Sequence, residues 1–150
     1  MSGIGDLYQA LVLDHSSRPR NFGSLEGATH TAEGHNPICG DHLDVGLIVE
    51  NGIVRDARFR GSGCAIAMAS ASLMTAAIKG KTSGEVRDLC ERFERMAAGH
   101  SEGPEDEARL GKLSIFARVS EFPGRVKCAT LVWQTVLGAL DGVTGPVSTE

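Results

Sequence analysis

Three of the four cysteines stand beside residues that favour thiolate chemistry. Cys39 lies in the run Asn36-Pro37-Ile38-Cys39-Gly40-Asp41, just ahead of a carboxylate. If the chain is extended there, Cys39 and Asp41 point to the same side, because strand side chains alternate with a period of two. A thiolate and a carboxylate then face one point, and His42 faces the other way.

Cys64 and Cys128 are each predicted to open a helix. Cys64 follows Gly61-Ser62-Gly63 and leads into an Ala-rich run, and Cys128 follows Pro123-Gly124-Arg125-Val126-Lys127. Free amide N–H groups and a partial positive charge at a helix N-terminus favour the thiolate, the form of cysteine that binds metals and attacks electrophiles. Up to three sulfurs and one carboxylate oxygen suit tetrahedral Zn²⁺ or an iron–sulfur cluster.

Spacing alone leaves other interpretations of the cysteines open. No two of them form a CxxC pair. The cysteines could also act as small hydrophobic residues in the core, or form two disulfides if the chain is exported. The first residues show no basic segment followed by a long apolar core, so we expect a reducing compartment, which disfavours the disulfides.

The bulk composition narrows the class of protein. A length of 150 residues suits one domain spanning 1–150, with an ordered core expected over about 6–140. Hydrophobic residues make up 41% and charged residues 23%, as in ordinary globular proteins. The net charge of −4 argues against a nucleic-acid binder, and no apolar stretch approaches the roughly 20 residues that cross a bilayer. A cytoplasmic location without membrane partners is the expectation.

The first half of the chain predicts one short helix and then a sheet. The helix covers residues 7–14, and the strands cover 28–34, 42–50 and 53–61. Asn51-Gly52 between the last two strands favours a tight hairpin, because both residues tolerate positive φ. A three-stranded antiparallel sheet is the predicted outcome.

The second half is predicted to be helical. The expected elements are helices over 64–79 and 84–97 (with Thr82 or Ser83 as N-cap), an exposed loop over 99–107, helices over 108–117 and 127–140, and a frayed tail over 141–150. Strands followed by helices predict an α+β fold, with about five helices packed mainly on one face of the sheet.

Several motifs in fixed order carry a resemblance to a known family. They are Asn36-Pro37-Ile38-Cys39-Gly40-Asp41, Gly61-Ser62-Gly63-Cys64-Ala65-Ile66-Ala67, Arg125-Val126-Lys127-Cys128-Ala129-Thr130-Leu131, the opening Tyr8…Asp14-His15…Pro19-Arg20-Asn21-Phe22-Gly23, and Ala69-Ser70-Ala71-Ser72-Leu73-Met74-Thr75 with Lys79-Gly80-Lys81. On these motifs the chain resembles the SufU branch of the IscU/NifU-type iron–sulfur cluster assembly proteins, and the resemblance runs from about residue 6 to residue 140. The implied fold is IscU/SufE-like.

Three departures from the IscU type favour the SufU branch. Lys127 stands where IscU-type members have a histidine before the last cysteine. The stretch from Glu121 to Lys127 differs from their Leu-Pro-Pro-Val-Lys chaperone-recognition segment. The long segment between Cys64 and Cys128 resembles the insertion that marks SufU proteins. The resemblance therefore does not extend to a chaperone partner or to a histidine ligand.

The resemblance implies a zinc-dependent sulfurtransferase. A SufS-type, PLP-dependent cysteine desulfurase would pass persulfide sulfur to Cys39, for later use by downstream iron–sulfur assembly proteins. One zinc per chain would be held by Cys39, Asp41, Cys64 and Cys128. Nearby charges, Arg125 and Lys127, would offset the negative site or dock the desulfurase. The alternatives are a scaffold for a [2Fe–2S] cluster and a small zinc-stapled binding module.

The remaining reactive side chains are predicted to be structural. Cys90 is interpreted as a packing or partly exposed thiol. The acidic run Glu105-Asp106-Glu107 is interpreted as a solvated surface. None of the histidines is at ligand spacing to another, and the positions concerned are His15, His30, His35, His42 and His100.

Overall fold

The computed structural model describes residues 4–101, 103–143 and 145–148. The elements in chain order are α1 (Ile4–Ser17), β1 (His30–Asn36), β2 (Asp41–Glu50), β3 (Ile53–Ser62), α2 (Ala65–Ile78), α3 (Ser83–Ala97), α4 (Pro104–Leu110), the 3₁₀ helix η1 (Gly111–Glu121), α5 (Pro123–Asp141) and β4 (Val147–Ser148). Among the described residues, none of these helices combines the length and apolarity needed to span a membrane.

The sheet begins as the predicted antiparallel meander. β1 pairs with β2, and β2 pairs with β3, both antiparallel. Asn51 and Gly52 close the second hairpin with φ of 53° and 75°. A tight hairpin turn requires such left-handed values, which Asn and Gly tolerate. The predicted hairpin at Asn51-Gly52 is confirmed.

The prediction of a three-stranded sheet is wrong, because the tail adds a fourth strand. Val147–Ser148 pairs in parallel with Gly34 and His35 of β1, which makes the sheet mixed, with the order β3-β2-β1-β4. The free edge of β1 offers unpaired N–H and C=O groups to this segment. Gly138 lets it approach, since a Cβ there would lie 2.8 Å from Val147 Cγ2. A two-residue strand is too short to leave a periodic pattern in the sequence.

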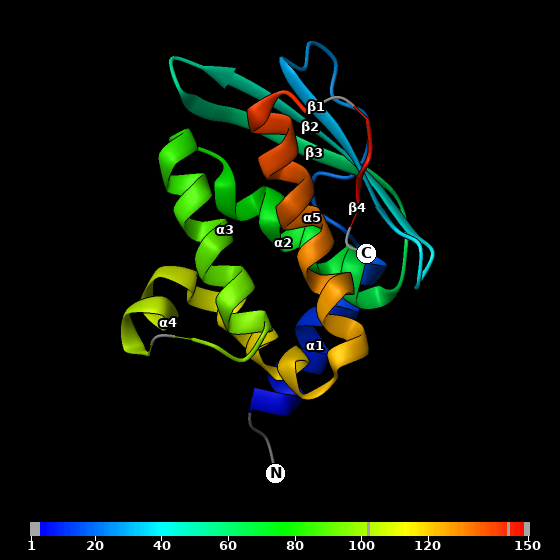
Figure 1. The fold of residues 1–150 in the computed structure, drawn as a ribbon, viewed down its shortest axis with the longest axis vertical. Coiled ribbons are helices and arrows are strands. Elements are labelled where there is room, and N and C mark those ends of the chain that lie inside the picture. The colour runs from blue at the N-terminus through cyan, green and yellow to red at the C-terminus, as the bar shows by residue number, and fades with distance from the viewer. Residues whose placement is uncertain (1–3, 102, 144, 149–150) are drawn as a thin grey trace.

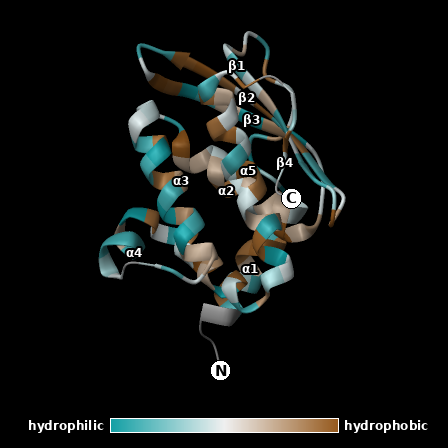
Figure 2. Ribbon diagram, in the orientation of Figure 1, coloured by the Kyte–Doolittle hydropathy of each residue, from teal (hydrophilic) through white to brown (hydrophobic). Residues whose placement is uncertain are grey.

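The helices cover one face of the sheet, as expected (Figure 1). Leu43, Val45 and Leu47 of β2 are buried beneath them, whereas the alternate residues of the strand are half-exposed. α5 lies against β1 and β2, and α2 packs between β3 and α5. In Figure 2, hydrophobic residues gather where helices and sheet meet, and hydrophilic residues mark the outward side of α3.

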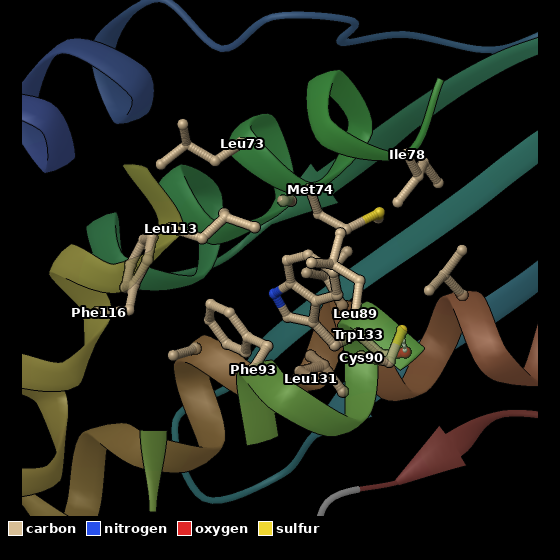
Figure 3. Close-up of a cluster of buried hydrophobic side chains, with 14 of the residues drawn as sticks. Leu73, Met74, Ile78, Leu89, Cys90, Phe93, Leu113, Phe116, Leu131 and Trp133 are labelled. Atoms are coloured by element: carbon tan, nitrogen blue, oxygen red, sulfur yellow. Dashed lines mark hydrogen bonds between the residues drawn. The ribbon is translucent and has the colours of Figure 1, made fainter. Parts of the chain in front are cut away.

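The centre of the core is Trp133 of α5 (Figure 3). Its ring stacks on Phe93 with centroids 4.5 Å apart, and its Nε1 donates to Ser70 Oγ at 3.1 Å. The Cys90 thiol is fully buried and points to the Trp133 carbonyl at 3.7 Å. Burial raises the pKa of Cys90, so this cysteine is a packing residue and not a partly exposed thiol.

The segment between α3 and α5 differs from its predicted loop and helix. α4 begins inside the expected loop because Pro104 suits the first turn of a helix. The expected helix over 108–117 breaks at Gly111, whose φ of 56° is left-handed, and the chain continues as a 3₁₀ helix. Pro104 therefore opens a helix, although its neighbours Gly103 and Glu105 are typical of a polar loop.

The prediction that the acidic run is solvated is wrong for one of its residues. Asp106 is only 1% exposed, and its Oδ1 pairs with Arg92 Nη1 at 2.6 Å and with Arg95 Nη2 at 3.0 Å. Glu105 and Glu107 on either side are exposed. Two arginines on α3 therefore decide which of three neighbouring acids is buried, and local sequence contains no such information.

Gly61 provides a first prediction, on stability. Its φ is +132°, and an added Cβ would collide with the backbone carbonyl of His42. We expect Gly61→Ala to lower the free energy of unfolding by at least ~2 kcal/mol, measured by urea denaturation. Gly27→Ala is the matched control, because Gly27 has φ +76° but open space around it, so it should lose only about 1 kcal/mol. Equal losses in both variants would contradict the collision.

His15 is a buried structural histidine. It is 6% exposed, and its Nδ1 lies 2.7 Å from Ser72 Oγ. Ser72 Oγ also accepts the Arg20 backbone N–H at 2.8 Å. Burial is the main cause that lowers the pKa of His15, Arg20 and Lys112 act in the same direction, and Asp14 opposes them.

This lowered pKa predicts a pH dependence of stability. The unfolded chain binds the proton more readily than the folded one, so the contribution of His15 is present above the ordinary pKa of about 6.5 and is lost as the pH falls below it. Urea unfolding at pH 7.5 and 5.5 should show a smaller loss for His15→Gln than for wild type. His100→Gln, changed in an exposed residue, should behave like wild type; equal losses in all three proteins would refute the assignment.

Candidate metal centre

Cys39 lies at the turn between β1 and β2. Residues 37–40 form this turn, in which Gly40 has φ 74° and its N–H donates to Asn36 O at 2.8 Å. Cys39 is exposed there. Because the chain turns instead of running extended, the alternation argument does not apply to Cys39, although it holds beyond it: Asp41 is buried on the inner face of β2, and His42 is half-exposed on the other.

Three of the four predicted ligands converge. One donor atom from each of Cys39, Asp41 and Cys128 lies within 4.8 Å of the other two. Cys128 Sγ lies 3.4 Å from Cys39 Sγ. Asp41 and Cys128 are fully buried, so the group has a closed inner side and one exposed sulfur.

Cys64 does not belong to this group of three, but it contacts one of its members, Asp41. Its backbone N–H donates to Asp41 Oδ1 at 2.9 Å. It caps α2, where its Sγ accepts the Ala67 N–H at 3.5 Å, as predicted for a cysteine that opens a helix. The Asp41 carboxylate thus accepts a hydrogen bond from the Cys64 backbone and also belongs to the group formed with Cys39 and Cys128.

The pKa values of Cys64 and Cys128 shift in opposite directions. A hydrogen bond from the Cys128 thiol is the main cause that lowers the pKa of Cys64 to about 6, helped by the N–H groups of Ala67 and Ile66 and opposed by burial and Asp41. The same hydrogen bond raises the pKa of Cys128, and burial and Cys39 add to that rise. Of these two cysteines, Cys64 is therefore the one that more readily forms a thiolate.

The prediction that Cys128 opens a helix is wrong. α5 begins at Pro123, so Cys128 lies in its second turn and has no free helix-end N–H beside it. Proline suits the first helical position, so the helix begins at Pro123, four residues before Lys127. The helix N-terminus therefore favours the thiolate of Cys64 but not that of Cys128.

Asn36 and Gly63 also shape the centre, although neither residue type indicates a metal ligand. Asn36 is fully buried, and its Nδ2 lies 3.3 Å from Asp41 Oδ2 and 4.0 Å from Cys128 Sγ. Gly63 leaves room for the carboxylate, because a Cβ there would lie 2.7 Å from Asp41 Oδ1. Asn36 pairs with Asp41 across the hairpin, so the strand register was the only sign of its position.

The predicted accessory charges lie on the first two turns of α5. Arg125 is exposed and Lys127 is half-buried. Within the part of the chain that the structure describes, neither forms an ion pair. They are therefore placed to act on the centre at longer range or on a partner, and their role stays a prediction.

Comparison with known proteins decides the family. Residues 7–129 match the family described as the NifU-like N-terminal domain. The chain belongs to this family. The resemblance to IscU/NifU-type proteins predicted from the motifs is confirmed.

Individual relatives share most of the chain. It is 38% identical over 140 residues to the iron–sulfur cluster assembly scaffold protein IscU of Thermotoga maritima, covering 93% of this chain and 96% of the relative. It is also 38% identical over 135 residues to the zinc-dependent sulfurtransferase SufU of Bacillus subtilis, covering 90% of each. A crystal structure of a putative SUF-system scaffold protein from Fervidobacterium islandicum has a TM-score of 0.83 at 34% identity, covering 92% of this chain and 99% of that one.

Proposed function

We propose that this protein is a zinc-dependent sulfur acceptor, taking persulfide sulfur from a PLP-dependent cysteine desulfurase in the cytoplasm for iron–sulfur cluster assembly. The observation that carries the proposal is one exposed cysteine, Cys39, whose sulfur lies 3.4 Å from that of the buried Cys128. The SufU relative, named as a zinc-dependent sulfurtransferase and 38% identical, supports it.

The donor set fits zinc. Ligand sulfurs about 2.3 Å from a tetrahedral ion lie roughly 3.8 Å apart, close to the 3.4 Å between Cys39 and Cys128. Asp41 supplies an oxygen within the same group. Cys64, whose backbone N–H already donates to Asp41 Oδ1 at 2.9 Å, would complete the set of four. When bound, zinc would keep the thiolates deprotonated without redox chemistry of its own.

The sulfur transfer that we propose is an exchange between two cysteines. The Cys39 thiolate attacks the outer sulfur of the desulfurase persulfide. A new S–S bond forms on Cys39, the S–S bond of the desulfurase breaks, and the desulfurase cysteine leaves as a thiolate. One bond replaces another of the same kind, so no external oxidant or reductant is needed.

The surroundings of Cys39 suit a protein partner. Ile38 beside it is 73% exposed, and Phe122 at the start of α5 is 50% exposed. Cys39 Sγ lies 4.0 Å from Gly124 O, so the turn that carries Ile38 and Cys39 lies against the first turn of α5. Exposed apolar residues around a reactive group are typical of an interaction site. Arg125 on the same turn adds a positive charge for an acidic partner surface.

The proposal is tested by incubating the purified protein with desulfurase and cysteine. Intact mass should show the gain of one sulfur atom, located on Cys39 by peptide mapping, and elemental analysis should give about one zinc per chain. A zinc-containing protein that never gains sulfur would instead indicate a small zinc-stapled binding module.

The second candidate function is a scaffold for a [2Fe–2S] cluster. Three thiolates and a carboxylate also suit iron, and the relative from Thermotoga maritima is named a scaffold. Protein purified without added metal separates the two functions. A colourless zinc protein supports sulfur transfer, and a brown protein with visible absorption supports the scaffold.

A further inference from the structure

A second group of metal-binding side chains lies on the outer face of the sheet. Glu33 and His35 of β1 stand opposite Asp44 and His42 of β2 in the strand register. All four side chains are at least partly exposed, on the face away from the helices. No sequence spacing connects His35 with His42, but antiparallel pairing brings them opposite each other.

The distances between three of these side chains match a small metal ion. His42 Nε2 lies 3.4 Å from Glu33 Oε2 and 3.5 Å from Asp44 Oδ1. Two ligands about 2.1 Å from a tetrahedral ion are roughly 3.4 Å apart, so both separations equal an edge of that tetrahedron. All three donor atoms also lie within 4.8 Å of one another.

A fourth donor and a supporting residue complete the group. The rings of His35 and His42 have centroids 5.9 Å apart, so the strand register supplies a second imidazole beside the three donors. Arg60 Nε donates to Asp44 Oδ2 at 3.4 Å and leaves Oδ1 directed at His42. Such hydrogen bonds to the second oxygen of a ligating carboxylate are typical of metal sites.

We infer that Glu33, His35, His42 and Asp44 form a second metal site, for a divalent transition ion such as Zn²⁺. Imidazole nitrogens exclude Mg²⁺ and Ca²⁺ as the preferred ions, because those ions select all-oxygen sites. Glu33 and Asp44 also line a hollow of about 580 Å³ on this face, which leaves the ion open to solvent. The site is independent of the cysteine centre, since His42 and Asp41 point to opposite faces of β2.

Zinc counting tests this site in the full chain. Protein dialysed against excess free Zn²⁺ should hold about two ions per chain, and His42→Gln about one. Glu33→Gln should weaken the second ion at least about tenfold. His100→Gln, changed in an exposed residue outside the sheet, is the matched control and should keep both ions. Circular dichroism and urea unfolding check that each variant folds.

Cadmium-113 NMR identifies the ligands of each ion without any measurement of activity. The expected result is one strongly deshielded resonance from thiolate ligands and a second, shielded resonance from nitrogen and oxygen ligands, the latter absent in His42→Gln. Failure to bind a second ion at about 100 µM free Zn²⁺ would overturn the inference and leave an ordinary ion pair. So would a second ion that His42→Gln retains. The thiolate resonance reports on the cysteine centre separately.

Discussion

Substitution of Cys39 by serine is expected to abolish sulfur uptake while leaving the fold and most of the zinc in place. Cys39 is exposed on a turn, so its removal costs no core packing. Asp41, Cys64 and Cys128 remain to hold the metal. Desulfurase turnover with Cys39→Ser should fall to the rate of the desulfurase alone, about 100-fold or more below the stimulated transfer, as expected when the nucleophile itself is removed.

The control for this variant is Cys90→Ala. Cys90 is buried against Trp133, far from solvent, and its raised pKa keeps it protonated. It should stimulate the desulfurase and gain one sulfur like wild type. Stimulation by Cys39→Ser at the wild-type level would show that the acceptor is another cysteine, and Cys64, with the lowered pKa, would be the next to test.

Substitution of Asp41 by alanine is expected to remove the metal and to loosen the centre. Its carboxylate accepts the Cys64 N–H at 2.9 Å and the Asn36 side chain at 3.3 Å. Alanine leaves both donors unsatisfied in the interior, at a cost of about 1–3 kcal/mol each. Because a ligand is also lost, zinc affinity should fall about 100-fold or more, measured by competition with a chelator.

Two further variants separate the roles of this carboxylate. Asp41→Asn keeps an oxygen for the Cys64 N–H but loses the charge, so it should keep most of the stability and still bind zinc weakly. Glu50→Ala, at the exposed far end of the same strand, should match wild type in both measurements. Zinc bound as tightly by Asp41→Ala as by wild type would remove Asp41 from the ligand set.

Together, the Cys39 and Asp41 variants give opposite patterns. Loss of sulfur uptake with zinc retained indicates an acceptor, and loss of zinc with Cys39 intact indicates a residue that holds the metal. A purely structural role for either residue predicts that stability, zinc and sulfur uptake decline together. Measuring all three quantities on each variant therefore assigns the roles.

The sequence by itself determined the local elements and the identity of the ligand candidates. Asn51-Gly52 set the hairpin because few residues adopt positive φ. Thr82 caps the N-terminus of α3, as predicted, and forms a capping box with Glu85. The motifs around Cys39, Cys64 and Cys128 indicated the family, which the match over residues 7–129 confirms. These properties depend on neighbours in the chain, and a single sequence contains them.

Only the tertiary structure decided what depends on partners distant in sequence. The strand register brought Asn36 beside Asp41, and the same register placed His35 opposite His42 on the other face. The arginines of α3 buried Asp106, and the free edge of β1 turned the tail into β4. The cysteine centre combines both levels: residue types named its ligands, but packing of α5 against the sheet brought Cys128 within 3.4 Å of Cys39, because long-range contacts leave no periodic mark in the sequence.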